Sequence, residues 1–292
     1  PNGGVSFRRS AKPVAGVRAI TALWIENGRL YVGTFGQGVF VSDDLGTSWQ
    51  AFNQGLVGGI LDSQLKLDDL TTRGGSLYAA TSGAGVYERN LTTGTWHPFG
   101  TEFEPNQASN VNSITLGGTR LLATGGGNGQ VFFRDPGDPD WTVSNLDNVG
   151  LHPGVEAQSA AFNGFGWVVG TNLGLFRSAT GQEPWSRFDP ALGTVRLITF
   201  ATQGRRLFAA FDTPLTAVMQ ESNDDGATWG NAETLPGVFV ARLAVSGNHL
   251  YAARGDGLWQ RAIVTVSVPP EGESPAIRLA LAGAQPFGDQ AH

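Results

Sequence analysis

Short apolar runs recur along this chain at nearly constant intervals. The clearest has the form Leu-Tyr-Val-Gly-Thr at residues 30–34, and similar runs lie at residues 77–81, 121–125, 167–171, 207–211 and 250–254. Runs of β-branched and apolar residues that are bounded by turn formers are typical of β-strands. The pattern therefore predicts a protein built from β-strand repeats.

Each repeat holds further strands around this run. An apolar strand follows a small Gly-rich loop, and a strand of small and branched residues, such as 19–23 or 243–245, precedes the run. A tryptophan closes the next hairpin, and the intervals between successive tryptophans are 47, 45, 44 and 44 residues, at Trp49, Trp96, Trp141, Trp185 and Trp229. Four strands in a unit of this length predict the blade of a β-propeller, with the small residues at its crowded centre.

The sixth repeat lacks its last strand, and a matching piece lies at the other end of the chain. Residues 4–7 match residues 46–49, and Phe7 lies 42 residues before Trp49. We expect an all-β, six-bladed β-propeller with four antiparallel strands per blade, whose last blade is closed by the N-terminal strand. This closure would cover an exposed sheet edge. A competing closure uses residues 264–268 as the outer strand.

Two other folds fit the pattern less well. A pair of β-sandwiches would not readily give six equal units. A WD40 propeller has the same period, but its Gly-His and Trp-Asp signatures are missing from this sequence.

A polar turn motif occurs twice, at residues 42–49 and 222–229. Its aspartate can accept hydrogen bonds from turn amides, its glycine supplies a positive φ, and its tryptophan folds back as a hydrophobic plug. The Asp pairs lack the alternating ligands and distal Glu of an EF-type calcium loop, so we expect no metal there. The predicted structural residues are Ser42, Asp44, Gly46, Trp49, Ser222, Asp224, Gly226 and Trp229.

These turns, in blades of this length, resemble the Asp-box (BNR-like) repeats of sialidase-like propellers. Similar turns occur in the photosystem II assembly factor, in sortilin-type receptors and in many secreted bacterial proteins. The resemblance covers roughly residues 4–263 and implies a propeller fold. It does not imply one function, because the same blade carries enzymes, lectins and assembly factors.

The repeat pattern stops near residue 263, where a Pro-rich, acidic linker follows at residues 269–275. We expect a propeller at 1–263 and a separate segment at 264–292. Residues 274–281, followed by residues 285–287, resemble the opening of the C-terminal sorting domain on cargo of the Bacteroidetes-type secretion system, with Gln285 in place of Asn. The resemblance implies a secreted or cell-surface protein. Because the chain begins at Pro1, we also expect that a preceding segment, such as a signal peptide, has been removed.

Composition excludes several classes of function. The net charge is −6, and the 17 Arg and 2 Lys form no basic stripe, so we expect no nucleic-acid partner. Without cysteine, the chain has no disulfide, thiol catalyst or Cys-ligated metal. No uninterrupted apolar window of about 18 residues exists, so we expect no transmembrane segment. We also expect no cofactor.

The positions of the tyrosines disfavour a sialidase. Sialidase chemistry needs a Tyr nucleophile, an adjacent Glu and three Arg that bind a carboxylate. Tyr31, Tyr78 and Tyr251 occupy the second position of the Leu-Tyr run, and Tyr87 lies in the following strand. All four are therefore expected to pack in the core. We expect no catalytic residues and no enzymatic activity.

Long connections on one face are the expected binding surface, since propellers usually bind through such loops. The longest are residues 52–64, 99–110 and 144–159. We expect a non-catalytic protein- or glycan-interaction module or a subunit of a larger extracellular assembly. The alternatives are a carbohydrate-active hydrolase or lyase that uses loop carboxylates, and an assembly factor for a membrane complex. The candidate binding residues are Asp62, Glu102, Phe103, Glu104, His152, Glu156, Asp212 and Asp256.

Overall fold

The computed structural model describes residues 20–44, 46–56, 65–100, 110–125, 129–146, 155–188, 196–212, 216–236, 240–246, 248–254 and 257–263. Within them the regular elements are all β-strands. Blades 1 to 3 contain β1 (Ile20–Glu26), β2 (Arg29–Thr34), β3 (Gly38–Ser42), β4 (Gln50–Ala51), β5 (Leu67–Arg73), β6 (Ser76–Thr81), β7 (Gly85–Asn90), β8 (His97–Pro98), β9 (Val111–Gly117), β10 (Arg120–Gly125), β11 (Gln130–Arg134) and β12 (Thr142–Asn145). Blades 4 to 6 contain β13 (Ala157–Phe162), β14 (Trp167–Thr171), β15 (Gly174–Ser178), β16 (Ser186–Phe188), β17 (Arg196–Gln203), β18 (Arg206–Asp212), β19 (Thr216–Ser222), β20 (Gly230–Pro236), β21 (Val240–Ser246), β22 (His249–Arg254) and β23 (Gly257–Ala262).

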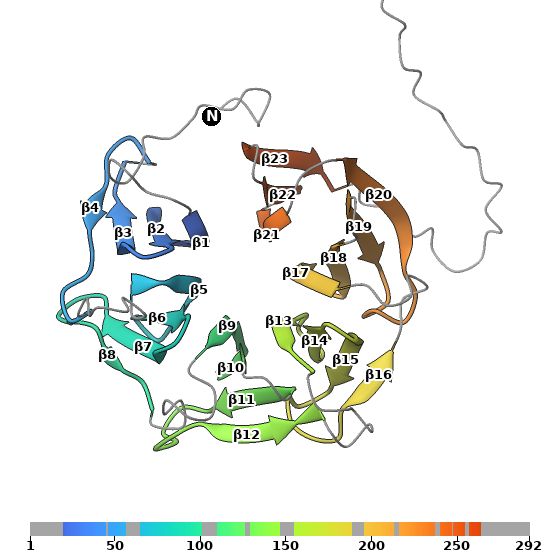
Figure 1. Cartoon of the computed structure of the whole chain (residues 1–292), viewed down its shortest axis with the longest axis horizontal. Coiled ribbons are helices and arrows are strands. Elements are labelled where there is room, and N and C mark those ends of the chain that lie inside the picture. Colours follow the sequence, from blue (N-terminus) through green and yellow to red (C-terminus); the bar gives the residue numbers. More distant parts are fainter. Residues whose placement is uncertain are drawn as a thin grey trace, which may run out of the picture. The chain divides into compact units, whose positions relative to one another are not determined.

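The strands form an all-β propeller. They pair in chain order into five four-stranded sheets and one three-stranded sheet, β21–β22–β23. The first strands of the sheets contact one another in sequence, from β1 through β5, β9, β13 and β17 to β21, and β21 contacts β1 (Figure 1). The series of contacts therefore closes on itself.

The predicted Leu-Tyr runs are the second strands of the blades, from β2 to β22. Every residue of β6 and of β14 is buried. Such continuous burial arises because each sheet has a neighbouring blade on both faces. The prediction of these strands is confirmed. Closure of the last blade by residues 4–7, or by residues 264–268, lies outside the described residues and stays a prediction.

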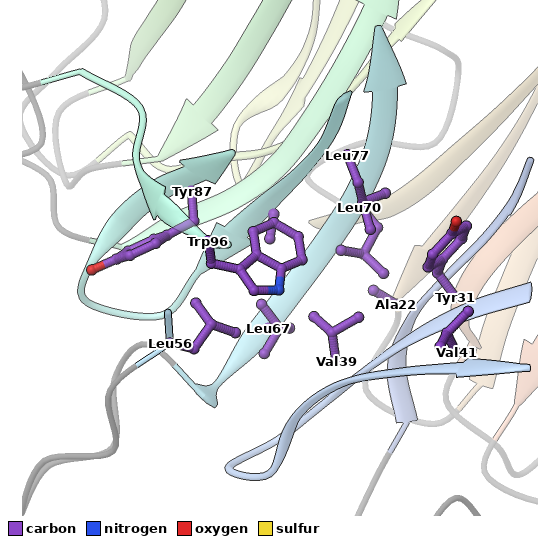
Figure 2. Packing of buried hydrophobic residues seen from close by; sticks show 11 residues of the cluster. Ala22, Tyr31, Val39, Val41, Leu56, Leu67, Leu70, Leu77, Tyr87 and Trp96 are labelled. Carbon is purple, nitrogen blue, oxygen red and sulfur yellow. The ribbon is translucent and has the colours of Figure 1, made fainter. Parts of the chain in front are cut away.

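Hydrophobic seams join neighbouring blades. Between blades 1 and 2, side chains of β2 and β3 such as Tyr31 and Val39 pack in one cluster with Leu67 and Leu70 of β5 and with Trp96 (Figure 2). All five are buried. Burial of this kind stabilises a fold by about 25 cal/mol per Å² of apolar surface, so the seams hold the ring together.

Three tryptophans also reach back to the preceding blade. Trp96 Nε1 donates to the carbonyl of Phe52 at 2.6 Å, and Trp141 Nε1 donates to that of Phe99 at 2.6 Å. Trp185 Nε1 donates to a side chain of the preceding blade, Ser144 Oγ, at 2.9 Å. The sequence suggested that these side chains close their own hairpins. In the structure these three also fix blades 2, 3 and 4 to the blade before, whereas Trp229 Nε1 donates to the carbonyl of Gly226 in its own turn at 3.0 Å.

The chain divides into two compact units, Pro1–Ala262 and Ile263–His292. The second unit lies outside the described residues except for Ile263, so the proposed linker and sorting-type segment stay predictions. No helix in the described part of the chain is long and apolar enough to cross a membrane.

Candidate functional site at the channel mouth

The propeller has two different faces. The loops from one blade to the next, and those between second and third strands, lie together, as the bridges Phe35 to Lys66 and Ser82 to Asn110 show. We name this side the blade-connection face. The turns between first and second strands and between third and fourth strands lie at the opposite ends of the same antiparallel strands, on what we name the turn face.

Each innermost strand carries a β-bulge next to the blade-connection face. In every blade the pairing with the second strand skips one residue near the start of the first strand. Bulges twist a strand locally and redirect side chains, and they are frequent beside functional sites. The skipped residues are Thr21, Asp68, Asn112, Gln158, Ile198 and Ala241. They form a repeated ring of bulges at this end of the central channel, which we name the channel mouth.

Two bulge residues bind the next blade in the same way. Thr21 Oγ1 donates to the carbonyl of Leu67, and Asn112 Nδ2 donates to that of Ala157 at 2.9 Å. Each acceptor is the first residue of the next innermost strand. Asp68 breaks this pattern, because an ionised carboxylate only accepts hydrogen bonds. Its Oδ2 accepts one from Ser82 Oγ instead.

An arginine bridges blades that are not neighbours in the ring. Arg242 Nη2, in blade 6, donates to the carbonyl of Asp68 in blade 2, and it lies 3.4 Å from the carbonyl of Asn112 in blade 3. It also lies 3.6 Å from Asp69 Oδ1. The guanidinium therefore joins three blades at the channel mouth. Its Nε is buried and has no hydrogen-bond partner among the described residues.

The two adjacent carboxylates of β5 have different surroundings. Burial raises the pKa of Asp68, the charge of Asp69 adds to this effect, and Ser82 and Arg242 oppose it. Asp69 accepts backbone hydrogen bonds from Ile114 at 3.1 Å and from Leu70 at 3.0 Å. Asp69 is thus held in place by backbone hydrogen bonds, whereas burial disfavours the negative charge of Asp68.

Exposed apolar side chains lie on blade 1, and two of them, Ile20 and Leu23, stand at the positions of Leu67 and Leu70, which in blade 2 pack against the preceding blade. Ile20 and Leu23 of the innermost strand are 49% and 46% exposed, and Phe35 of the blade-connection face is 44% exposed. The Lys66 ammonium lies 5.6 Å from the centre of the Phe35 ring. We name Ile20, Leu23 and Phe35 the blade 1 patch. Among the described residues, only one other large hydrophobic side chain, Phe165, is comparably exposed.

The structure places two of the eight predicted binding residues. Glu156 directly precedes β13 and is exposed, and its Oε2 accepts a hydrogen bond from Gln158 at 2.8 Å, so it lies at the channel mouth. Asp212 ends β18, and the backbone is all that is described there. The remaining predictions lie outside the described residues: Asp62, Glu102, Phe103, Glu104, His152 and Asp256.

Sequence reasoning missed Asp68, Asp69 and Arg242. A signal was present, since two adjacent carboxylates and a guanidinium lie in the predicted innermost strands. Charged residues at such positions need partners. Nothing local in the sequence shows that these partners come from different blades.

The two polar turns lie on the turn face and have the expected hydrogen bonds. Ser42 Oγ accepts from the Gly46 amide at 2.8 Å, and Asp44 accepts from the amide and hydroxyl of Ser48 at 2.8 and 2.6 Å. The hydrogen bonds that Asp44 accepts lower its pKa to about 2, and the bond from the Ser48 hydroxyl contributes most. Gly46 has φ of 84°, and Trp49 is half-buried.

The second turn repeats this geometry. Ser222 Oγ accepts from the Gly226 amide at 2.8 Å, and Asp224 accepts from the amide and hydroxyl of Thr228 at 2.8 and 2.6 Å. Gly226 also has φ of 84°. The near-identical distances show that the motif determines its own conformation.

The described tyrosines are packed as the sequence predicts. Tyr31, Tyr78 and Tyr87 are at most 5% exposed, and the Tyr78 hydroxyl donates to Glu88 Oε1 at 2.9 Å. The side chain of Tyr251 is not described. Across the described ranges, no group of three or more His, Cys, Asp or Glu side chains is placed to hold a metal ion.

Comparison with known proteins supports the fold alone. No protein-family model matches the sequence, and no curated protein matches it. Among solved structures, the extracellular domain of BT4673 from B. thetaiotaomicron is similar, with a TM-score of 0.64 and 16% identity over 82% of this chain and 32% of that one. YCF48 from Cyanidioschyzon merolae has a TM-score of 0.60 and 14% identity over 82% of this chain and 81% of that one.

A structure of YCF48 bound to D1 peptide is also similar, with a TM-score of 0.61 and 14% identity over 84% of this chain and 79% of that one. The chain spans about a third of the BT4673 domain and most of YCF48. At such identities, the protein shares an all-β propeller fold with these structures.

Proposed function

We propose that this protein is a non-catalytic interaction module, secreted or at the cell surface, that binds a protein or glycan partner at its blade-connection face. The observations that carry the proposal are the exposed blade 1 patch and the polar cluster of Asp68, Asp69 and Arg242 at the channel mouth. An apolar patch next to fixed polar groups is the usual composition of a recognition surface.

A protein partner fits this surface better than a glycan. Ile20 and Leu23 are aliphatic, and they gain most when they are buried against apolar side chains of another protein. Asp68 and Arg242 would then orient the partner through hydrogen bonds. The structure of YCF48 bound to D1 peptide supports a peptide partner by analogy of fold. The likeness to the extracellular domain of BT4673 supports the proposed location in the same way.

The proposal can be tested by capture from the native source with purified protein, followed by measurement of the affinity of each captured component. Replacing Ile20, Leu23 and Phe35 by Ser should weaken specific binding at least tenfold, the loss expected when central apolar contacts are removed. The matched control is Phe165→Ser, which removes an exposed aromatic side chain from the turn face. Equal binding by the triple variant and the wild type would disprove the proposed surface.

The alternative of a carbohydrate-active hydrolase has one observation in its favour. Asp68 has a raised pKa and lies beside a second carboxylate, the arrangement that separates a general acid from a base. However, Asp69 is occupied by two backbone amides and lies near Arg242. Turnover of a polysaccharide panel that is lost in Asp68→Asn would favour the hydrolase over the interaction module.

We further propose that the ring has six blades and that residues 4–7 complete the last one. Trp96, Trp141 and Trp185 bind the preceding blade 44, 42 and 41 residues earlier. The same step back from Trp49 reaches residues 5–8. Removing residues 1–9 should therefore lower stability, whereas ending the chain after Ile263 should not. The reverse result would favour closure by residues 264–268.

A further inference from the structure

A cavity of about 390 Å³ opens on the turn face, between blades 1 and 2. It lies at the far end of the propeller from the channel mouth. Its walls carry two carboxylates, one guanidinium, a phenol and an aliphatic side chain. The lining residues are Glu26, Asn27, Gly28, Arg29, Tyr31, Asp43 and Leu91.

The equivalent place between blades 2 and 3 is filled by an arginine. Arg73 ends its innermost strand, as Glu26 does in blade 1. The Arg73 guanidinium lies 5.4 Å from the centre of the Tyr78 ring and 5.8 Å from that of Phe99. It donates to the carbonyls of Thr119 and Arg134 in blade 3, at 3.3 and 3.1 Å. A cation over an aromatic pair thus joins these two blades.

Blade 1 repeats the aromatic pair but only one of its two cations. The Arg89 guanidinium lies 3.6 Å from the centre of the Phe52 ring, as Arg134 lies 3.8 Å from that of Phe99, whereas no described arginine takes the place of Arg73. Tyr31 and Phe52 occupy the positions of Tyr78 and Phe99, with ring centres 5.7 Å apart compared with 4.8 Å in blade 2. Glu26 takes the place of Arg73 at the end of the innermost strand, and its shorter side chain is not a cation. The cavity is therefore the repeat's cation position, vacated by an exchange of arginine for glutamate.

The charges around the cavity favour a cation. Arg29 binds Asp43 through two hydrogen bonds, of 2.5 and 3.1 Å, and this pairing raises the pKa of Arg29. Glu26 accepts a single neutral hydrogen bond, from Thr72 Oγ1 at 3.0 Å. With one arginine against two carboxylates, the lining itself carries a net charge of about −1 at neutral pH, and Arg89 lies outside it against the Phe52 ring.

We propose that this cavity binds the guanidinium of an arginine side chain from a partner protein or peptide. The guanidinium would lie over the Tyr31 ring, as Arg73 lies over Tyr78, and donate hydrogen bonds to Glu26. This site is distinct from the blade 1 patch, and neither proposal depends on the other. The protein thus has a second binding position at a seam between blades.

The probe for this test is N-acetyl-arginine amide, titrated into the full chain. Trp24 reports on the site, because its Nε1 donates to Thr72 Oγ1, the same hydroxyl that donates to Glu26. We expect saturable shifts of the Trp24 indole N–H resonance. Glu26→Gln should weaken binding about tenfold, because it removes the charge from the hydrogen bond. N-acetyl-citrulline amide, which has the same shape without charge, should not bind.

A second variant fills the cavity from within. Glu26→Arg restores the residue type of Arg73 at this position and should abolish binding of the probe. The matched control is Asp135→Asn, which weakens the corresponding pair with Arg120 in blade 3, where Arg120 also donates to the carbonyl of Thr180 in blade 4 at 2.6 Å. This control should bind the probe like the wild type.

The proposal fails if the arginine probe gives no saturable shift, or if the citrulline probe shifts the same resonance equally. It also fails if Glu26→Gln binds as tightly as the wild type. Glu26→Gln and the citrulline comparison decide the question even if Glu26→Arg does not fold, since thermal unfolding identifies folded variants independently.

Discussion

The two ends of this propeller are built in different ways. On the turn face, Ser42 and Gly46 bind each other across four residues of sequence, and the second copy of the motif does the same. At the channel mouth, Arg242 binds backbone carbonyls that lie 174 and 130 residues away in the sequence. The comparison separates two kinds of information: the fold is encoded in local repeats, and the proposed recognition surface depends on contacts that only the closed ring creates.

The largest loss of stability is expected from a substitution at the channel mouth, where the contacts are nonlocal. Arg242→Ala leaves Asp69 without its cation and removes the bridge between blade 6 and blades 2 and 3. We expect the free energy of unfolding to fall by about 2 kcal/mol, because a half-buried charge loses its partner. Denaturant unfolding measures this loss.

The control for this prediction lies on the turn face. Arg205→Ala removes an ion pair with Asp225 in which the Arg205 side chain is 61% exposed. Solvent screens such pairs, so a clearly smaller loss is expected. Equal losses for Arg242→Ala and Arg205→Ala would mean that the channel mouth is no more tightly coupled than the surface.

Substitutions in the turn-face motif, whose hydrogen bonds are local, should cause a loss of stability of intermediate size. Gly46→Ala and Gly226→Ala each force a side chain into φ of 84°. We expect each to cost about 1–2 kcal/mol, the usual strain of an alanine in the left-handed region. Because the two turns have the same geometry, the two losses should agree closely in thermal or denaturant unfolding. Clearly unequal losses would show that surrounding blades, not the motif, determine the turn.

The smallest expected effects are changes of stability with pH. Acidification should change the stability contributions of Asp44, on the turn face, and of Asp68, at the channel mouth, in opposite directions. Asp44 has a pKa lowered from 3.8 to about 2, so its contribution to stability is present above pH 3.8 and is lost as the pH falls towards 2. Asp68 has a raised pKa, so its ionised form costs stability at neutral pH, and this cost disappears as the pH falls through the raised pKa to 3.8.

Unfolding measured between pH 7 and pH 2 tests these signs. The stability of the wild type relative to Asp44→Asn should fall on acidification, whereas that relative to Asp68→Asn should rise. Carbon-13 titration of the two carboxyl groups provides an independent measurement. A titration midpoint below 3.8 for the Asp68 carboxyl group would contradict the burial of its charge.

The blade strands could be predicted because each is marked by residues close in sequence. The run at residues 30–34 and the tryptophan at position 96 identify a second strand and a blade end without reference to the rest of the chain. The turn at residues 42–49 is equally self-contained, and the hydrogen bonds from turn amides to its aspartate were predicted from residue types alone.

The candidate site could not be predicted in this way. Asp68 and Arg242 are marked in the sequence only as charged residues of predicted innermost strands, and their proximity depends on closure of the ring. The bulges that redirect the first strands depend on pairing register, which sequence patterns do not specify at single-residue precision. Loop acids such as Glu156 were predicted because loops commonly carry binding residues, a rule that says nothing about what innermost strands contribute.

The cavity between blades 1 and 2 shows a third kind of information. Neither Glu26 nor Tyr31 indicates a site by itself. Their meaning comes from comparison with Arg73 and Tyr78 one repeat later, once the structure has shown which positions correspond. In a repeat protein, a departure from the chain's own pattern can therefore mark a candidate site where no relatives are aligned.

The central claim is that the partner binds at the blade-connection face, and site-specific photo-crosslinking tests it most directly. A crosslinking residue at Leu23, in the blade 1 patch, is compared with one at Thr47, which is exposed in the turn-face motif. With the partner from the native source, we predict a specific crosslinked product from position 23 and none of that partner from position 47. A product from position 47 alone would contradict the account.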